Sequence, residues 1–276
     1  MSFKQINVQC HEDVAQILMA EMSVIGYDIF EENEEGFTTS IASEQFNKVD
    51  LQTVFDKYHQ LFDFQWKSFD IEKVNWNEEW EKNYQPVQVG DQVYVRAIFH
   101  EPKPEFPFEI VIHPKMSFGT GHHDTTHLVL KQQLTIPHQD CKVYDFGSGT
   151  GILAIMAGLL GATSILGNDV DDWCIENAKE NLSLNKINAE MLLGPVKSLN
   201  LTQQAEIILA NINKNILMEE MEEYARLLKP NGHLVISGFY QADIPDLEKK
   251  GHDLGLLSKH HETKNKWSTV VFTKPS

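Results

Sequence analysis

Three glycines at alternate positions follow an aspartate in residues 142–151, K-V-Y-D-F-G-S-G-T-G. The residues before Asp145 are typical of the end of a buried strand, and residues 152–161 have the length and small side chains of a helix. Glycine is needed where the backbone turns sharply and a ligand must lie close to it, and a helix start offers free N–H groups. A strand, a glycine turn and a helix therefore predict a nucleotide-binding α/β sheet, with Asp145, Gly147 and Gly149 at the ligand.

The spacing of the glycines discriminates between nucleotides. A dinucleotide fingerprint is G-x-G-x-x-G, but here Ile152 stands where the third glycine would fall. A carboxylate at Asp145 repels a pyrophosphate and suits a cation. S-adenosyl-L-methionine carries a sulfonium and an ammonium, so the turn favours this cofactor, and a dehydrogenase is the weaker alternative.

Asp169 gives a second signal for the same cofactor. It ends the next predicted strand, which begins at residue 164. A carboxylate at this place offers two acceptors to the ribose hydroxyls of a nucleotide. A glycine turn without any ligand remains an alternative, and the position of Asp169 argues against it.

Asn211 follows a near-continuous apolar run, residues 206–210, which predicts a further buried strand. A methyl acceptor must be placed in line behind the sulfonium, about 3 Å from the methyl group. If the acceptor is an amine, the side-chain oxygen of Asn211 could accept an N–H bond from it, and we find no dedicated general base. The alternative is that Asn211 caps the next helix.

A loop rich in glycine, threonine and histidine covers residues 116–127. We expect it to lie over the cofactor pocket, with the hydroxyls of Thr125 and Thr126 facing the cofactor and with Asp124 capping the following helix. The spacing of His123 and His127 suits a metal. No glutamate or third ligand accompanies them, so we predict no metal, and the role of His122, His123 and His127 stays open.

The N-terminal segment has a different pattern. Its apolar spacing predicts strand, helix, strand, strand, helix and strand within residues 1–74, which is a ferredoxin-like α+β domain. Trp76, Trp80 and Tyr84 fall four residues apart and predict a linker helix over residues 75–84. The domains are then 1–74 for substrate recognition, the linker, and 85–276 for methyl transfer.

Charge and composition limit the partners. The chain has 276 residues, 42% of them hydrophobic, so a sizeable core is possible, and its formal net charge is −17. Residues 1–100 hold 7 Lys and Arg against 18 Asp and Glu, which disfavours direct binding of nucleic acid and favours a basic partner. Three dispersed cysteines form no metal or disulfide pattern, and no apolar segment is long enough for a membrane, so we expect a cytoplasmic protein.

Four segments resemble, in order and spacing, the bacterial ribosomal protein L11 methyltransferases (PrmA-type). They are M-S-F-G-T-G-H-H-D-T-T-H, Y-D-F-G-S-G-T-G-I-L-A-I-M-A-G-L-L-G-A, G-N-D-V-D-D-W-C-I-E-N-A-K-E-N-L-S-L-N and L-A-N-I-N-K-N-I-L. The glycine turn is common to class I methyltransferases, whereas the F-G-T-G-H-x-x-T-T loop together with A-N-I is far more specific. The resemblance covers about residues 75–240 closely and the N-terminal domain only in pattern.

The resemblance implies a Rossmann-like α/β fold with a seven-stranded sheet, joined by a linker helix to a small recognition domain. It implies S-adenosyl-L-methionine as donor, and lysine side chains and the N-terminal amine of the ribosomal protein as acceptors. Carried over by position, the cofactor contacts are Thr126, Gly147, Asp169 and Asn211. We expect a monomer. A methyltransferase for another substrate and a non-catalytic S-adenosyl-L-methionine-binding protein remain as alternatives.

Overall fold

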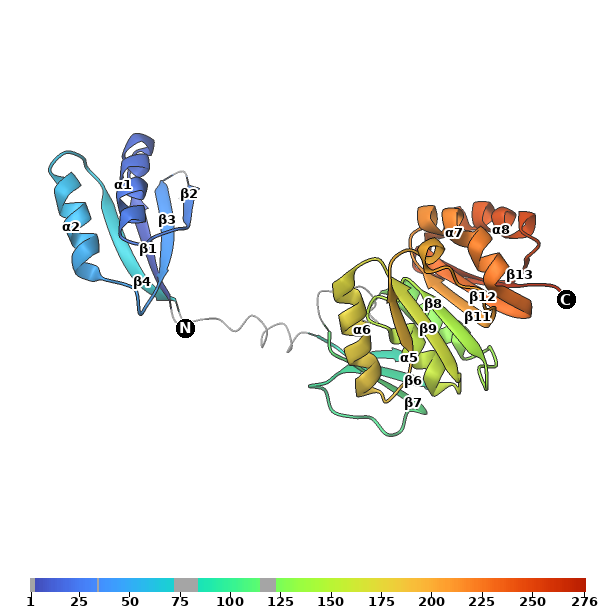
Figure 1. Cartoon of the computed structure of the whole chain (residues 1–276). Coiled ribbons are helices and arrows are strands. Elements are labelled where there is room, and N and C mark those ends of the chain that lie inside the picture. Colours follow the sequence, from blue (N-terminus) through green and yellow to red (C-terminus); the bar gives the residue numbers. More distant parts are fainter. Residues whose placement is uncertain (1–2, 34, 72–83, 115–122) are drawn as a thin grey trace. The chain divides into compact units, whose positions relative to one another are not determined.

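The computed structural model describes residues 3–33, 35–71, 84–114 and 123–276 (Figure 1). The chain forms two compact units, residues 1–83 and 84–276. The predicted linker helix over residues 75–84 lies outside the described residues except for Tyr84. We describe each unit by itself.

The N-terminal unit has the predicted order of strands and helices. Its elements are β1 (Phe3–Gln9), α1 (Glu12–Val24), β2 (Phe30–Asn33), β3 (Gly36–Ala42), α2 (Lys48–His59) and β4 (Gln65–Ile71). The strands form one sheet in the order β2-β3-β1-β4, and all neighbours are antiparallel. This is the ferredoxin-like arrangement. Both helices pack on one face of the sheet, where Leu18, Met22, Phe37 and Phe55 are fully buried.

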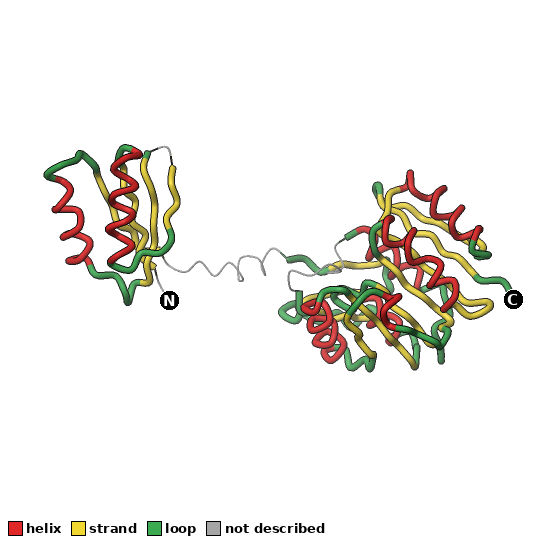
Figure 2. The backbone as a smooth tube through the Cα atoms, turned by 45° about the horizontal axis from the view of Figure 1, so that its top comes forward, coloured by secondary structure: helices red, strands yellow, loops and turns green. Residues whose placement is uncertain are grey.

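The C-terminal unit contains two sheets (Figures 1 and 2). A three-stranded sheet, β5-β6-β7, is built from β5 (Val87–Val89), β6 (Val93–Ala97) and β7 (Phe108–Ile112). The second sheet has seven strands in the order β10-β9-β8-β11-β12-β14-β13. Its strands are β8 (Lys142–Phe146), β9 (Ser164–Asp169), β10 (Glu190–Leu193), β11 (Ala205–Asn211), β12 (Leu228–Tyr240), β13 (Leu257–Lys264) and β14 (Trp267–Thr273).

Alternating side chains of the seven-stranded sheet bury two separate cores. Val143, Ile207 and Leu209 point to one face, which is covered by α4, α5 and α6. Tyr144 and Ile208 point to the opposite face, which is covered by α7 and α8. The helices are α4 (Asp124–Gln133), α5 (Ile152–Leu159), α6 (Asp172–Leu184), α7 (Lys214–Leu227) and α8 (Ile244–Asp253), with short 3-10 turns at Val196–Leu199 and Gln241–Asp243. The predicted seven-stranded α/β fold is confirmed.

Strand β12 has an irregular start. It begins at Leu228, directly after α7, and includes Pro230 and Gly232. In the pairing with β11, Ala205 lies opposite Leu228 and Ile207 lies opposite His233. Residues 229–232 of β12 are therefore extra residues that form an irregularity within the strand. Pro230 is tolerated in this irregular part of the strand because no backbone N–H is needed there to donate to a neighbouring strand. Among the described helices, none has the length and apolar character needed to cross a membrane.

Candidate cofactor and methyl-transfer site

The predicted site residues lie at the carboxyl edge of the seven-stranded sheet. Strands β9, β8 and β11 are parallel neighbours, and they end at Asp169, Phe146 and Asn211. The carboxyl ends of parallel strands meet at one edge, where open α/β sheets bind their ligands. The fold therefore brings together the glycine turn, Asp169 and Asn211, which are up to 64 residues apart in the sequence.

The glycine turn needs glycine at each of its three alternate positions. Gly147, Gly149 and Gly151 have φ angles of 69°, 52° and 77°, in the left-handed region that residues with a side chain rarely adopt. The Ser148 N–H donates to the carbonyl of Asn168 at 2.9 Å, and the Ser148 hydroxyl donates to the carbonyl of Asp145 at 2.7 Å. These bonds tie the turn to β8 and β9, and Gly151 then begins α5.

We expect Gly147→Ala to lower both stability and affinity for the cofactor. A Cβ at Gly147 would lie 2.3 Å from Cγ2 of Ile212, in addition to the strain of the positive φ, which costs about 1–2 kcal/mol. Gly90→Ala is the matched control, since its φ is 58° and no atom lies within 4 Å of the added Cβ. Thermal unfolding and calorimetric titration with S-adenosyl-L-methionine test this. A larger effect of Gly90→Ala on cofactor affinity would contradict it.

Asp145 is a buried carboxylate with one unused oxygen. It is 0% exposed, and the Ala154 N–H donates to its Oδ2 at 3.1 Å. Its Oδ1 accepts no hydrogen bond from any described residue. Burial, together with the smaller effect of the Asp169 charge, raises the pKa of Asp145 to about 7, against the lowering effect of the bond from the Ala154 N–H. A buried acid with an unused acceptor suits the cationic part of S-adenosyl-L-methionine, so the residues present fit this cofactor.

We expect cofactor affinity to rise with pH between about 5.5 and 7. The pKa of Asp145 is raised from its ordinary 3.8, so its protonated form is favoured in the free protein and its ionised form near a bound cation. Affinity then changes by at most about tenfold per pH unit below the pKa.

In the protein without cofactor, the contribution of Asp145 to the free energy of unfolding falls as pH rises from about 4 to about 7. Asp145→Asn should flatten both slopes, and titration calorimetry and thermal unfolding measure them; equal slopes in both proteins exclude Asp145 as the cause.

Asp169, at the end of β9, accepts a hydrogen bond from the glycine turn that follows β8. Its Oδ2 accepts from the Gly149 N–H at 2.9 Å, and its Oδ1 accepts from the Asp171 N–H at 3.2 Å. Each carboxylate oxygen can accept more than one bond, so acceptor capacity remains for the ribose hydroxyls. Asp169, Asp171 and Cys174 form the one group in the described residues with metal-ligand distances. Burial raises the pKa of Cys174 to about 12, so its thiol stays protonated at neutral pH in the protein without a metal.

Asn211 contacts helix α4 and does not cap α7. Its Nδ2 lies 3.4 Å from Oγ1 of Thr126, a hydroxyl on a side chain that is 1% exposed. The cap of α7 is Asn213, whose side chain accepts from the Ile216 N–H at 3.2 Å. The capping alternative for Asn211 is therefore wrong. No hydrogen bond among the described residues uses Oδ1 of Asn211.

The start of α4 differs from the expectation. His123, not Asp124, caps the helix, and its Nδ1 accepts from the Thr125 N–H at 3.3 Å. Asp124 instead accepts from Nδ2 of Asn265 at 2.7 Å, which fixes α4 to the β13–β14 turn. Burial lowers the pKa of His127. His122 and residues 115–121 lie outside the described residues, so the expected position of the loop over the cofactor stays a prediction.

Two features of the site were missed from the sequence. Ile212 lies between Gly147 and Gly238, and a Cβ at Gly238 would be 2.2 Å from the carbonyl oxygen of Ile212. Helix α6 also buries two asparagines, Asn177 and Asn181, and Asn181 donates to the glycine turn. Their four-residue spacing was a visible signal, but asparagine on a helix is usually exposed.

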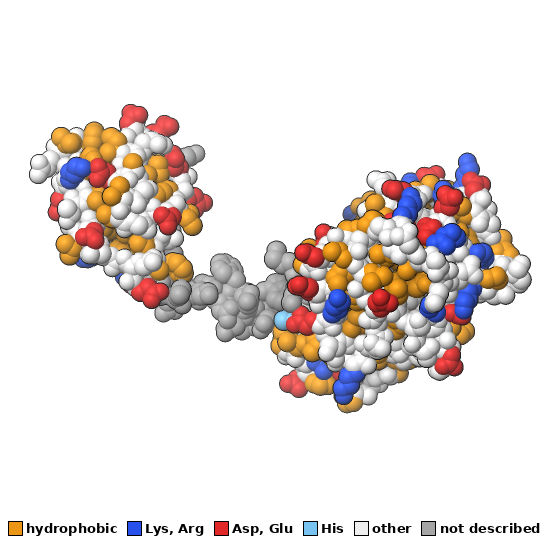
Figure 3. Space-filling view, viewed as in Figure 1, with side chains coloured by type: hydrophobic (Ala, Val, Ile, Leu, Met, Phe, Trp, Pro, Cys, Tyr) orange, Lys and Arg blue, Asp and Glu red, His pale blue; other side chains and the backbone are white. Residues whose placement is uncertain are grey.

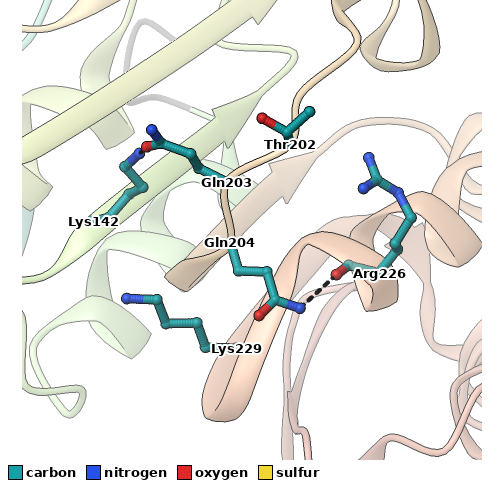
Figure 4. A pocket seen from close by; sticks show the side chains of 6 residues that line it. All are labelled: Lys142, Thr202, Gln203, Gln204, Arg226 and Lys229. Carbon is teal, nitrogen blue, oxygen red and sulfur yellow. Dashed lines mark hydrogen bonds between the residues drawn. The ribbon is translucent and has the colours of Figure 1, made fainter.

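The cavity in Figure 4 is distinct from this site. It has a volume of about 550 Å³ and is lined by Lys142, Thr202, Gln203, Gln204, Arg226 and Lys229. Lys142 begins β8 and Lys229 lies at the start of β12, so the cavity is at the amino edge of the sheet. Arg226 pairs with Glu223, and Lys229 pairs with Glu206. These bonds occupy two of the three cations, so the cavity has little free charge for a ligand.

The fold and the carboxyl-edge site define an S-adenosyl-L-methionine-dependent methyltransferase of the class I α/β type. The sequence profile described as ribosomal protein L11 methyltransferase (PrmA) matches residues 5–275. The chain therefore belongs to the ribosomal protein L11 methyltransferase family.

Individual relatives agree with this assignment. The ribosomal protein L11 methyltransferase of Phocaeicola vulgatus is 38% identical over 267 residues, covering 95% of each chain. That of Porphyromonas gingivalis is 39% identical over 269 residues, covering 96% of this chain and 92% of the relative. The crystal structure of a ribosomal protein L11 methylase from Lactobacillus delbrueckii subsp. bulgaricus has a TM-score of 0.62 at 24% identity, over 70% of this chain and 100% of that chain, and so shares the fold.

Proposed function

We propose that this chain transfers methyl groups from S-adenosyl-L-methionine to amines of ribosomal protein L11, at lysine side chains and the N-terminal amine. The observation that carries the proposal is the match of nearly the whole chain, residues 5–275, to one family whose relatives are named for this substrate. Asn211 next to Thr126 at the carboxyl edge supports it, because an acceptor oxygen is needed where an amine must be oriented.

In this reaction the protein has to position the amine and remove water from around it. The cofactor supplies a methyl group already activated by its sulfonium. A lysine amine has a reference pKa of about 10.4 and must lose a proton before it can attack. A water-poor site favours the neutral amine, and Oδ1 of Asn211 would accept one of its N–H groups and so orient the lone pair. Asp145 is buried and Asp169 accepts two backbone N–H groups, so we assign neither as general base.

The N-terminal unit is proposed to bind the ribosomal protein. Figure 3 shows acidic side chains over its visible face and few basic ones. Residues 3–71 contain 4 lysines, no arginine and 13 Asp and Glu, a difference of −9. Such an excess attracts a basic protein by long-range steering and repels nucleic acid. A monomeric, cytoplasmic enzyme without direct nucleic-acid contacts is part of the same proposal.

The test of the proposal uses methyl-labelled S-adenosyl-L-methionine, the purified full-length chain and a mixture of ribosomal proteins freed of RNA. Label on ribosomal protein L11, located by mass spectrometry at lysine or N-terminal amines, is the expected result. Label on a different protein would keep the methyltransferase and reject this substrate. Cofactor binding without any transfer, including with purified ribosomal protein L11, would favour a non-catalytic binding protein.

A further inference from the structure

Three asparagines follow one another at four-residue intervals on and just after α6, at Asn177, Asn181 and Asn185. Asn177 and Asn181 are 0% exposed. Buried amides must find hydrogen-bond partners, since an unpaired one costs about 1–3 kcal/mol. Besides bonds within α6, the partners of these side chains are backbone groups of β7, of His113 directly after it, and of the glycine turn.

The first set of bonds joins α6 to the outer edge of β7, an edge strand of the three-stranded sheet, and to His113 directly after it. Asn185 accepts from the Val111 N–H at 2.8 Å and donates to the Val111 carbonyl at 2.6 Å. Asn181 accepts from the His113 N–H at 2.7 Å, and Asn177 donates to the His113 carbonyl at 3.4 Å. The side-chain amides thus take the place of a neighbouring strand.

The spacing explains why asparagine can do this. Four residues of a helix rise about 6.0 Å, and two residues of a strand rise about 6.6 Å. Side chains on every fourth residue of a helix therefore lie opposite every second residue of a strand over about two repeats, because the two rises nearly match. An asparagine amide carries the same donor and acceptor as a peptide group.

Of the three asparagines, Asn181 is the one that bonds to the glycine turn within the described part of the chain. Its Nδ2 donates to the carbonyl of Thr150 at 2.9 Å and to Oδ1 of Asn177 at 2.7 Å. Thr150 is 0% exposed and lies between Gly149 and Gly151. With its oxygen bonded to His113, the amide of Asn181 uses its acceptor and both of its N–H groups. Asn185 has no bond to the turn among the described residues.

We propose that Asn181 is a positioning residue for the cofactor, because it fixes the Thr150 carbonyl and with it the shape of the glycine turn. The bond from Asn181 adds to those that join the turn to β8 and β9, among them the bond between the Gly149 N–H and Asp169. Glycines in left-handed conformations have wide backbone freedom, so the shape of the turn depends on such bonds. Apparent affinity falls in proportion to the fraction of molecules with the binding-competent turn.

The test compares Asn181→Ala with Asn185→Ala in the full-length chain. Asn185→Ala is the matched control, because it removes two bonds to the same edge strand and none to the turn. We expect Asn181→Ala to weaken S-adenosyl-L-methionine binding about tenfold, and Asn185→Ala to change it by less than about twofold, at similar losses of Tm. Calorimetric titration gives the affinity and thermal unfolding without cofactor gives the Tm.

A second variant covers the case in which Asn181→Ala does not fold. Asn181→Asp keeps an acceptor for the His113 N–H but turns an anionic oxygen toward the Thr150 carbonyl, so at pH 8 it should also weaken binding at least about tenfold. Normal affinity in the Asn181 variants, or an equal loss in Asn185→Ala, would overturn the proposal. The inference rests on the cofactor and not on the methyl acceptor, so a negative result with ribosomal protein L11 leaves it unaffected.

Discussion

Replacing Asn211 with alanine is expected to lower the turnover of methyl transfer by about a hundredfold or more while cofactor affinity stays within about threefold. The side chain ends β11 at the carboxyl edge, and its Nδ2 contacts Thr126 at 3.4 Å. The loss of this long bond has a small effect on the fold. Loss of Oδ1 removes the acceptor proposed to orient the amine, which matters only when the amine attacks.

Asn213→Ala is the control for this experiment, since it removes the cap of α7 two residues away. The cap should contribute about 1 kcal/mol to stability and little to turnover. Single-turnover kinetics with ribosomal protein L11 and titration with S-adenosyl-L-methionine separate the two effects. Equal losses of turnover and affinity in Asn211→Ala would instead assign Asn211 to cofactor binding alone.

Removal of the N-terminal unit is expected to give the second large effect. A chain that begins at residue 84 keeps both sheets of the C-terminal unit, which has its own hydrophobic cores. It should bind S-adenosyl-L-methionine within about threefold of the full chain but methylate ribosomal protein L11 at least about a thousandfold more slowly. Binding energy from parts of a substrate remote from the reaction is what holds its amine in place.

Thermal unfolding of the shortened chain, with and without cofactor, first establishes that it folds. Rates of methylation at low substrate concentration then measure the effect of the deletion. Methylation of ribosomal protein L11 within tenfold of the full chain would contradict a recognition role for residues 1–74. A further control is the salt dependence of the full chain, because steering by the acidic N-terminal unit should weaken as ionic strength rises.

The sequence by itself determined the local structure at most of the site. The alternate glycines required a left-handed turn because no other residue adopts that backbone at so little cost, and φ angles of 69°, 52° and 77° agree. The residues before Asp145 and the apolar run before Asn211 predicted buried strands, and the structure buries Val143 and Tyr144 on opposite faces of the sheet. Periodicity also predicted every element of the N-terminal unit, since strand and helix repeats differ.

Only the tertiary structure decided which polar side chains act together. The Asn211–Thr126 contact spans 85 residues, and it arises because α4 packs across the end of β11. The N-cap of α4 is His123 and not Asp124, and the N-cap of α7 is Asn213 and not Asn211. The choice depends on the residue at which each backbone changes from the extended to the helical conformation. The bonds of Asn181 to His113 and Thr150 depend on the end of β7 and the glycine turn both lying next to the same face of α6. Local sequence patterns describe short-range repeats, whereas such long-range partners follow from packing alone.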